Sequence, residues 1–161
     1  VDHVVPEGAW RSEAELEKIM RQMAPQHLAR VGQELESTRW RAGAVFRRIR
    51  IENGEKVQRA EVRYDGLAGC LRTPAGGSSR QFLLVTEKGK ARLRPLLARE
   101  AARLMGLPDD YRLPQRETPA LKVLGDGVCV PVVRWLGEHL LAPLANARQP
   151  SPAAAPLQAA E

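Results

Sequence analysis

Arginine supplies most of the chemistry that this sequence can offer. Its 161 residues include 25 lysines and arginines against 19 aspartates and glutamates, and 20 of the 25 basic residues are arginine. Five arginines fall between residues 39 and 50, where Trp40 and Phe46 accompany them and no acidic residue does. Guanidinium groups bind phosphate in bidentate fashion and aromatic rings stack on bases, so this run predicts a nucleic-acid-binding surface. The alternative is that a GC-rich genome enriches arginine through its codons.

A second candidate site is the segment 66–81, which is rich in glycine and small hydroxyl side chains. It contains Arg72 and Arg80 and no acidic residue. Such a loop lets the backbone approach a ligand closely and offers amides and hydroxyls as donors. The alternative is a flexible hairpin tip that binds nothing.

Cysteine chemistry is limited to Cys70 and Cys129. Two cysteines cannot build a disulfide framework or a four-ligand zinc site, so we expect no metal site and a reducing, cytoplasmic environment. No apolar run approaches the roughly 18–20 residues of a membrane span, and no signal peptide opens the chain. The sequence therefore predicts a protein outside the membrane.

Periodic apolar residues indicate the elements that position these groups. We expect helices over 13–23 and from Pro25 to Leu35, and strands up to Ile51 and from Val57 to Tyr64 around a turn at 52–55. We expect a short strand over 82–85, a helix over 99–105 ended by Gly106, mostly loop over 109–124, and a long helix over 128–144. The last helix would carry one apolar stripe, and residues 145–161 would be disordered. The stripe consists of Val132, Val133, Leu136, Leu140, Leu141 and Leu144.

Two stretches in the later half carry a resemblance to a known family. Arg99-Glu-Ala-Ala-Arg-Leu-Met-Gly-Leu-Pro-Asp-Asp-Tyr111 and Gly125-Asp-Gly-Val-Cys-Val-Pro131 resemble motifs IX and X of the DNA (cytosine-5-)-methyltransferases. Phe46-Arg-Arg-Ile-Arg50 is similar to motif VIII, and 66–81 to the second recognition loop of the target-recognition region.

The resemblance implies roles for named residues. Arg48 and Arg50 would contact the flipped-out cytosine, and Asp126, Gly127 and Val128 would line the pocket of the methyl donor S-adenosyl-L-methionine. Double-stranded DNA would be bound by the following loop residues: Arg72, Thr73, Gly76, Gly77, Ser78 and Arg80. The implied fold is α/β, part of a Rossmann-like S-adenosylmethionine-dependent methyltransferase fold with a small β-rich target-recognition module.

The sequence also departs from the family pattern. Phe46 replaces a polar residue of motif VIII, and Asp126 replaces the usual asparagine of motif X. Leu97 and Ala98 stand where motif IX begins Thr-Pro or Ser-Pro, so Glu100 loses its capping partner, which costs about 1 kcal/mol. The family's nucleophile follows a proline, and neither Cys70 nor Cys129 does.

We therefore expect the C-terminal part of such an enzyme, inactive without an N-terminal catalytic half. Its segments would be a helical lead-in (1–38), motif VIII with the recognition region (39–92), motifs IX and X (93–144) and the tail (145–161). The alternatives are a stand-alone, non-catalytic DNA-binding module and a non-functional gene remnant.

Overall fold

The computed structural model describes residues 5–74 and 80–147. The chain divides into two compact units, Val1–Val128 and Cys129–Glu161, which are described separately. Three of the expected DNA-contacting residues, Gly76, Gly77 and Ser78, lie outside the described residues, as do residues 148–161 of the predicted tail. The expectation of disorder was wrong for residues 145–147, which belong to a helix.

The first unit is built on a four-stranded antiparallel sheet in the order β2-β1-β3-β4. Two tight turns connect its hairpins, with positive φ angles at Asn53 and Gly54 and at Lys88 and Gly89. Two-residue turns of this kind match the twist of the strands and favour asparagine and glycine. The strands are β1 (Arg41–Glu52), β2 (Glu55–Arg63), β3 (Phe82–Glu87) and β4 (Lys90–Pro95).

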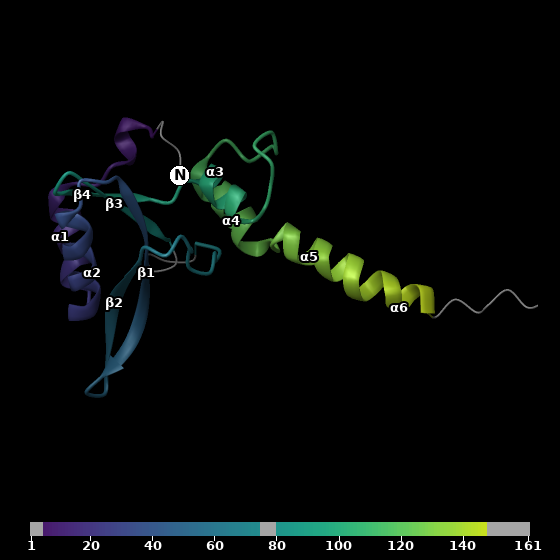
Figure 1. Ribbon diagram of the computed structural model, residues 1–161, viewed down its shortest axis with the longest axis horizontal. Coiled ribbons are helices and arrows are strands. Elements are labelled where there is room, and N and C mark those ends of the chain that lie inside the picture. Colours follow the sequence, from purple (N-terminus) through teal and green to yellow (C-terminus); the bar gives the residue numbers. More distant parts are fainter. Residues whose placement is uncertain (1–4, 75–79, 148–161) are drawn as a thin grey trace, which may run out of the picture. The chain divides into compact units, whose positions relative to one another are not determined.

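Two amphipathic helices, α1 (Glu13–Arg21) and α2 (Pro25–Glu36), lie against one face of the sheet (Figure 1). A short 3₁₀ turn, Glu7–Ala9, precedes them. Ser12 and Glu15 form the capping box predicted at the start of α1, which satisfies two backbone amides that have no helical partner.

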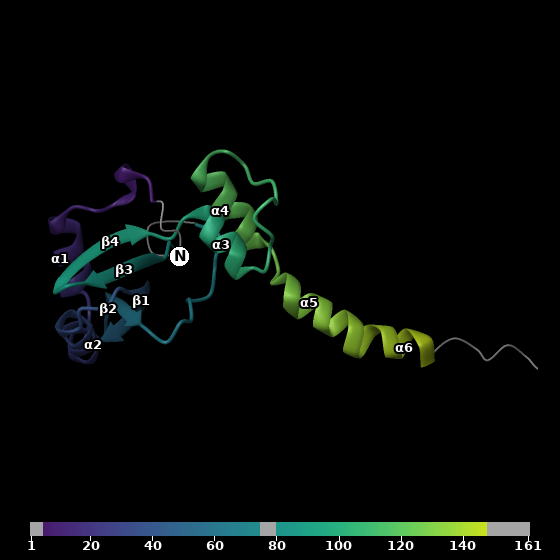
Figure 2. The same cartoon turned by 45° about the horizontal axis from the view of Figure 1, so that its top comes forward.

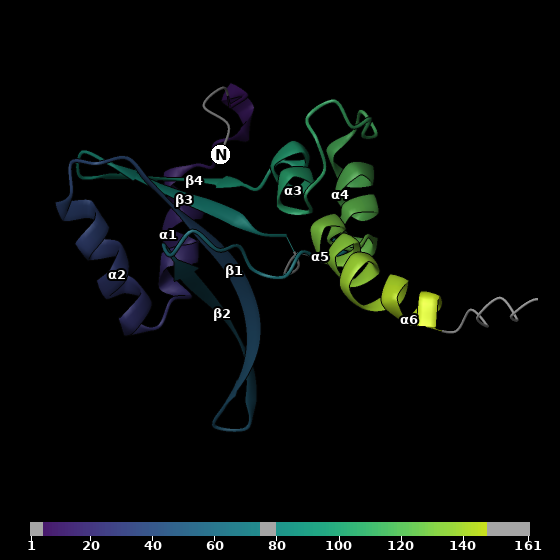
Figure 3. The ribbon, with the colours of Figure 1, turned by 45° about the vertical axis from the view of Figure 1, so that its right-hand side comes forward.

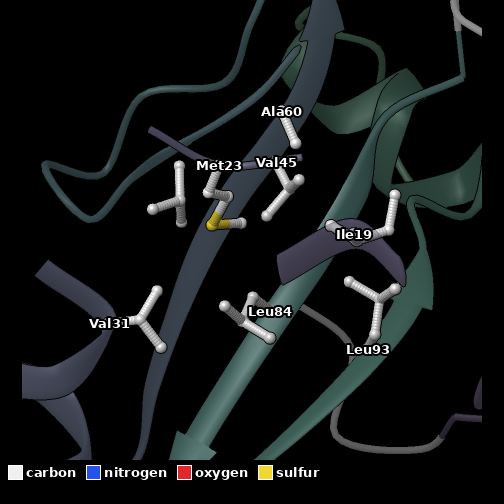
Figure 4. Close-up of a cluster of buried hydrophobic side chains, with 8 residues drawn as sticks. Ile19, Met23, Val31, Val45, Ala60, Leu84 and Leu93 are labelled. Carbon is white, nitrogen blue, oxygen red and sulfur yellow. The ribbon is translucent and has the colours of Figure 1, made fainter. Parts of the chain in front are cut away.

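The main core fills the space between these helices and the sheet (Figure 4). Val31 of α2, Val45 of β1 and Leu84 of β3 are fully buried there. Side chains alternate between the faces of a strand, so every second residue of β1 and β3 faces the helices. The cluster comprises Ile19, Met23, Val31, Val45, Ala60, Val62, Leu84 and Leu93.

A second core joins the opposite face of the sheet to α3 (Ala98–Leu104) and α4 (Glu117–Asp126), which pack together (Figure 2). Gly106 follows α3 and adopts a left-handed backbone conformation, with a φ of 76°. Glycine in this conformation commonly ends a helix, as the sequence predicts here. The expectation of loop up to residue 124 was wrong. Pro119 lies in the first turn of α4, where an amide has no helical acceptor, and burial of Ala120 and Leu124 stabilises the helix.

The second unit is helical over its described residues. It runs through α5 (Val130–Leu136), a π-helical segment (Gly137–Leu141) and α6 (Ala142–Ala147). The predicted long helix is thus present from residue 130, with a local change of winding at Gly137. The apolar stripe is exposed, including Val132, Leu140 and Leu144.

Among the described residues, the span Glu117–Ala147, which contains α4, α5 and α6, is long and apolar enough to cross a membrane by length and composition, and its most apolar window is 0% buried. A single span of this kind is weak evidence, so the expectation of a protein outside the membrane stays a prediction.

The fold of the described residues is mixed α/β, as expected, with an antiparallel sheet. A Rossmann-like sheet is mostly parallel. The described residues contain no such sheet.

Candidate nucleic-acid interface

The β1–β2 hairpin extends well past the ends of α1 and α2 (Figure 3). Arg48 and Arg50 lie two residues apart on β1, so they share one face of this hairpin. Both guanidinium groups pair with Glu61 of β2; the Nε of Arg48 lies 3.7 Å from its carboxylate. The Arg48 guanidinium also lies over the Phe46 ring, 5.0 Å from its centre. The two arginines are half-exposed and are held in place by a carboxylate that is mostly buried.

Two further ion pairs stiffen the same hairpin. Arg59 of β2 binds the carboxylate of Glu52, and this hydrogen bond lowers the pKa of Glu52. Arg63 binds Asp65 just after β2, and its hydrogen bonds lower the pKa of Asp65 to about 2. Glu52 and Glu61 of the hairpin, and Asp65 just after it, thus each pair with at least one of its arginines.

The candidate recognition loop begins at Gly66 and returns at Gln81. Of the predicted DNA contacts in this loop, Arg72 is exposed, and Thr73 and Arg80 are partly buried. The side chain of Gln81 is 6% exposed and links the two ends of the loop. Its Oε1 accepts from the amide of Gly69 at 2.9 Å, and its Nε2 donates to the carbonyls of Gly69 and Cys70.

The predicted cofactor turn lies beside this loop. Asp126, the last residue of α4, accepts a hydrogen bond from the Thr73 hydroxyl. A Cβ placed on Gly125 would lie 2.2 Å from the Thr73 amide nitrogen, so the two backbones are in direct contact. Gly127 and Val128 are exposed. The structure therefore brings Asp126 and Thr73 together, although sequence reasoning assigned them to different ligands.

At the start of α3 Leu97 provides no side-chain cap, as expected, and two carboxylates bind the free amides. The Glu100 carboxylate accepts from the Leu97 amide at 3.0 Å, and the Glu117 carboxylate of α4 accepts from the Ala98 amide at 3.0 Å. A carboxylate at a helix N-terminus is favourable because the amides there lack helical partners. Glu117 also lies 3.9 Å from Arg80, so α4 contacts both α3 and the return of the loop.

An apolar cavity of about 270 Å³ opens between the loop, the sheet and α3. Leu67, Leu83, Leu96 and Leu104 supply apolar walls, and Arg103 contributes a charged group.

Sequence reasoning missed four residues that organise this interface: Glu61, Gln81, Glu117 and Gly125. Glu61, Glu117 and Gly125 each contact a residue that is distant in sequence, and Gln81 binds residues at the other end of the same loop. The one available signal was the strand alternation that places Glu61 on the face of Arg48 and Arg50.

Neither cysteine follows a proline, as the nucleophile of the family does. Cys70 is exposed in the loop and Cys129 is partly buried at the start of the second unit, and both are free thiols. Among the described residues, no group of three or more histidines, cysteines, aspartates or glutamates is arranged to hold a metal ion.

Comparison with known proteins matches residues 9–142 to the model of the C-5 cytosine-specific DNA methylase family. The chain is 39% identical over 62 residues to the type II methyltransferase M.NlaX of Neisseria lactamica, which is 38% of this chain and 20% of that protein. It is 37% identical over 97 residues to M.HpaII of Haemophilus parainfluenzae, 51% of this chain and 26% of that protein. The matches thus span 20% and 26% of the length of these two relatives. No solved structure matches it.

Proposed function

Because the chain belongs to the C-5 cytosine-specific DNA methylase family, we propose that it is the C-terminal part of a DNA (cytosine-5-)-methyltransferase. In this proposal it holds the target DNA and completes the S-adenosyl-L-methionine pocket for methyl transfer to cytosine C5. The contact between the recognition loop and the turn of motif X, at Thr73 and Asp126, carries the proposal. It supports the proposal because a hydroxyl of the loop proposed for DNA is hydrogen-bonded to a carboxylate of the turn proposed for the methyl donor.

The recognition loop would supply the DNA contacts. Arg72 and Arg80 offer guanidinium groups that fit phosphate or the edge of guanine, and Thr73 offers a hydroxyl. Gly76, Gly77 and Ser78 would complete this contact, since a glycine-rich segment lets amides approach the DNA closely. Arg72 is exposed, as a DNA contact must be.

Arg48 and Arg50 would act on the target cytosine after it leaves the base stack. Positive charge held in place stabilises negative charge that develops on the ring during attack. Glu61 would be a positioning residue in this scheme, because it binds both guanidinium groups and limits their motion.

The turn at Asp126, Gly127 and Val128 fits one wall of a methyl-donor pocket. The Asp126 carboxylate suits this role because it accepts hydrogen bonds from an ammonium or a hydroxyl group. All three residues are exposed, so they can be reached by a ligand. When bound, S-adenosyl-L-methionine supplies an activated methyl group. Asp126 would hold the cofactor through its carboxylate, one oxygen of which accepts from Thr73.

Catalysis would require a partner that brings the nucleophile. The reaction needs a cysteine thiolate to attack cytosine C6, and the sequence contains no Pro-Cys dipeptide. We propose that an N-terminal catalytic half supplies it, together with the Rossmann-like sheet. The exposed stripe of α5 and α6 is a contiguous apolar surface that this sheet would cover.

In this proposal residues 1–38 are a helical lead-in, 39–92 contain motif VIII and the recognition region, and 93–144 contain motifs IX and X. The relatives are named type II methyltransferases, so a restriction-modification system in the cytoplasm is the proposed setting.

Fluorescence anisotropy with a labelled duplex tests the DNA-binding part. We expect weak, non-specific binding by the 161-residue chain, with an affinity that falls steeply as salt rises, because phosphate neutralisation releases counterions. Binding that does not change between low and physiological salt would contradict the proposal.

Co-expression with an upstream half that carries Pro-Cys tests the catalytic part. The pair should methylate cytosine C5 and neither half should do so alone. If DNA binding is present but no upstream half restores methylation, the chain is a stand-alone DNA-binding module. Methylation by the chain alone would refute the assignment of roles.

A further inference from the structure

The two ends of the recognition loop are held by groups that lie outside it or at its edge. Gln81 holds Gly69 and Cys70 through three hydrogen bonds from a side chain that is 94% buried. Further along the same arm, Arg72 and Thr73 lie against the last turn of α4. Both contacts hold the outgoing arm of the loop, and the first also joins it to Gln81 at the return.

The contact with α4 depends on a missing side chain. A Cβ on Gly125 would lie 2.2 Å from the Thr73 nitrogen, 2.4 Å from the Arg72 carbonyl carbon and 2.6 Å from the Thr73 Cα. Distances below 3.0 Å are not tolerated, and here all three atoms belong to a backbone that cannot swing aside as a side chain would. Gly125 lies within a helix, where its φ is ordinary, so close approach is the reason that glycine is required here.

A hydrogen bond also holds the loop against α4 at this contact. The Thr73 hydroxyl donates to the Asp126 carboxylate, next to Gly125 in the chain. Leu71, two residues before Thr73, packs on the second core together with Leu124. Side chains on both sides of Gly125 thus hold this arm of the loop on α4.

We propose that Gly125 and Asp126 are positioning residues for DNA recognition: they form a seat on α4 that fixes Arg72 and Thr73 in the place where these residues meet DNA. This inference rests on the proposed function, because it assumes that the loop binds DNA. It adds that the seat, 52 residues away along the chain, sets the geometry of that binding. An arm held in its bound position loses less conformational freedom on binding.

Substitution of Gly125 separates the seat from the stability of α4. Alanine is a better helix former than glycine, so Gly125→Ala favours α4 while its Cβ pushes Arg72 and Thr73 away. We expect about a tenfold loss of duplex affinity, with the salt dependence unchanged because no charge is lost. Gly32→Ala is the matched control: it lies inside α2, and a Cβ there meets no atom within 4 Å. Its duplex affinity should equal that of the unmodified chain.

Two substitutions of Asp126 provide a test that does not depend on Gly125. Both Asp126→Asn and Asp126→Ala remove a negative charge, which by itself strengthens binding to DNA. Asparagine keeps an oxygen that accepts from Thr73, whereas alanine does not. We therefore expect Asp126→Ala to bind duplex at least fivefold more weakly than Asp126→Asn.

The measurements are duplex anisotropy at several salt concentrations, thermal unfolding, and hydrogen exchange of residues 69–74, all on the 161-residue chain. Faster exchange in this arm in Gly125→Ala, together with weaker binding and an unchanged unfolding midpoint, supports the seat. Should Gly125→Ala fail to fold, the comparison of the two Asp126 variants decides.

Equal affinities for Asp126→Ala and Asp126→Asn, or wild-type affinity in folded Gly125→Ala, would overturn the inference. Failure of the proposed function gives a different result. In that case the unmodified chain shows no salt-dependent binding, while Gly125→Ala still accelerates exchange in the arm; the seat then exists without a role in DNA recognition.

Discussion

A buried ion pair joins the sheet to α3 and invites a quantitative test. Arg94 of β4 is 0% exposed and Glu100 of α3 is 5% exposed, and they share two hydrogen bonds of 2.7 Å. Glu100 also accepts from the Leu97 amide, and Trp10 lies 5.8 Å from the Arg94 guanidinium. The Nε of Arg94 has no hydrogen-bond partner among the described residues.

Loss of one partner should cost far more than loss of both. Glu100→Leu leaves a buried guanidinium without its carboxylate and should lower the free energy of unfolding by about 3–5 kcal/mol. In Arg94→Met/Glu100→Leu no buried charge remains and the unpaired Nε is removed. The free energy of unfolding of the double variant should therefore lie within about 1 kcal/mol of that of the wild type. The remaining difference arises because the Leu97 amide loses the carboxylate that accepts its hydrogen bond.

Urea unfolding followed by far-ultraviolet circular dichroism measures these differences. With a slope of about 2 kcal/mol per molar urea, the single variant should unfold at a midpoint about 2 M lower, and the double variant close to wild type. If the double variant is as unstable as the sum of the two single variants, the pair stabilises the fold outright and the argument from charge burial fails.

Three further predictions follow from other features. In a reconstituted enzyme, Arg50→Ala should slow methyl transfer by a factor of about 100–1,000 at nearly unchanged duplex affinity. Arg80→Ala should instead weaken DNA binding or alter the preferred DNA site. A single-turnover rate that is unaffected by Arg50→Ala would disprove the role assigned to Arg50. Burial raises the pKa of Tyr64 to about 12, so its neutral form is favoured in the folded state, and stability present below the ordinary tyrosine pKa is lost as pH rises toward 12. Absorbance titration should show this late step, and its persistence in Tyr64→Phe would be contrary evidence. Leu140→Lys in the apolar stripe should reduce self-association of the isolated chain in analytical ultracentrifugation, and the interpretation is wrong if the unmodified chain is already a well-dispersed monomer.

Local patterns in the sequence predicted local structure well. The capping box at Ser12, the Asn53-Gly54 turn and the stop at Gly106 all depend on residues within one turn of one another, and each is present. Helix α4 was missed because Pro119 and Gly125 disfavour a helix by propensity, while the burial that stabilises it comes from α3 and the sheet. Strand β4 has few apolar residues in alternation and was not predicted.

The site was only partly accessible from sequence for the same reason. Motif resemblance pointed to Asp126 and Thr73 separately. Their hydrogen bond, and the clearance at Gly125, arise from packing between segments about 50 residues apart, and no periodic pattern encodes such a contact. The pairing of Glu61 with two arginines depends likewise on the register between β1 and β2.

The attachment of the recognition loop to both Gln81 and α4 has a practical consequence. Gln81 and the end of α4 hold the outgoing arm of the loop at Gly69–Cys70 and at Arg72–Thr73. The residues that make these contacts lie outside the stretch between Thr73 and Arg80, so substitutions confined to that stretch leave the contacting residues unchanged. A library randomised over that short stretch of the gene would therefore sample new DNA specificities while the attachment of the arm is kept.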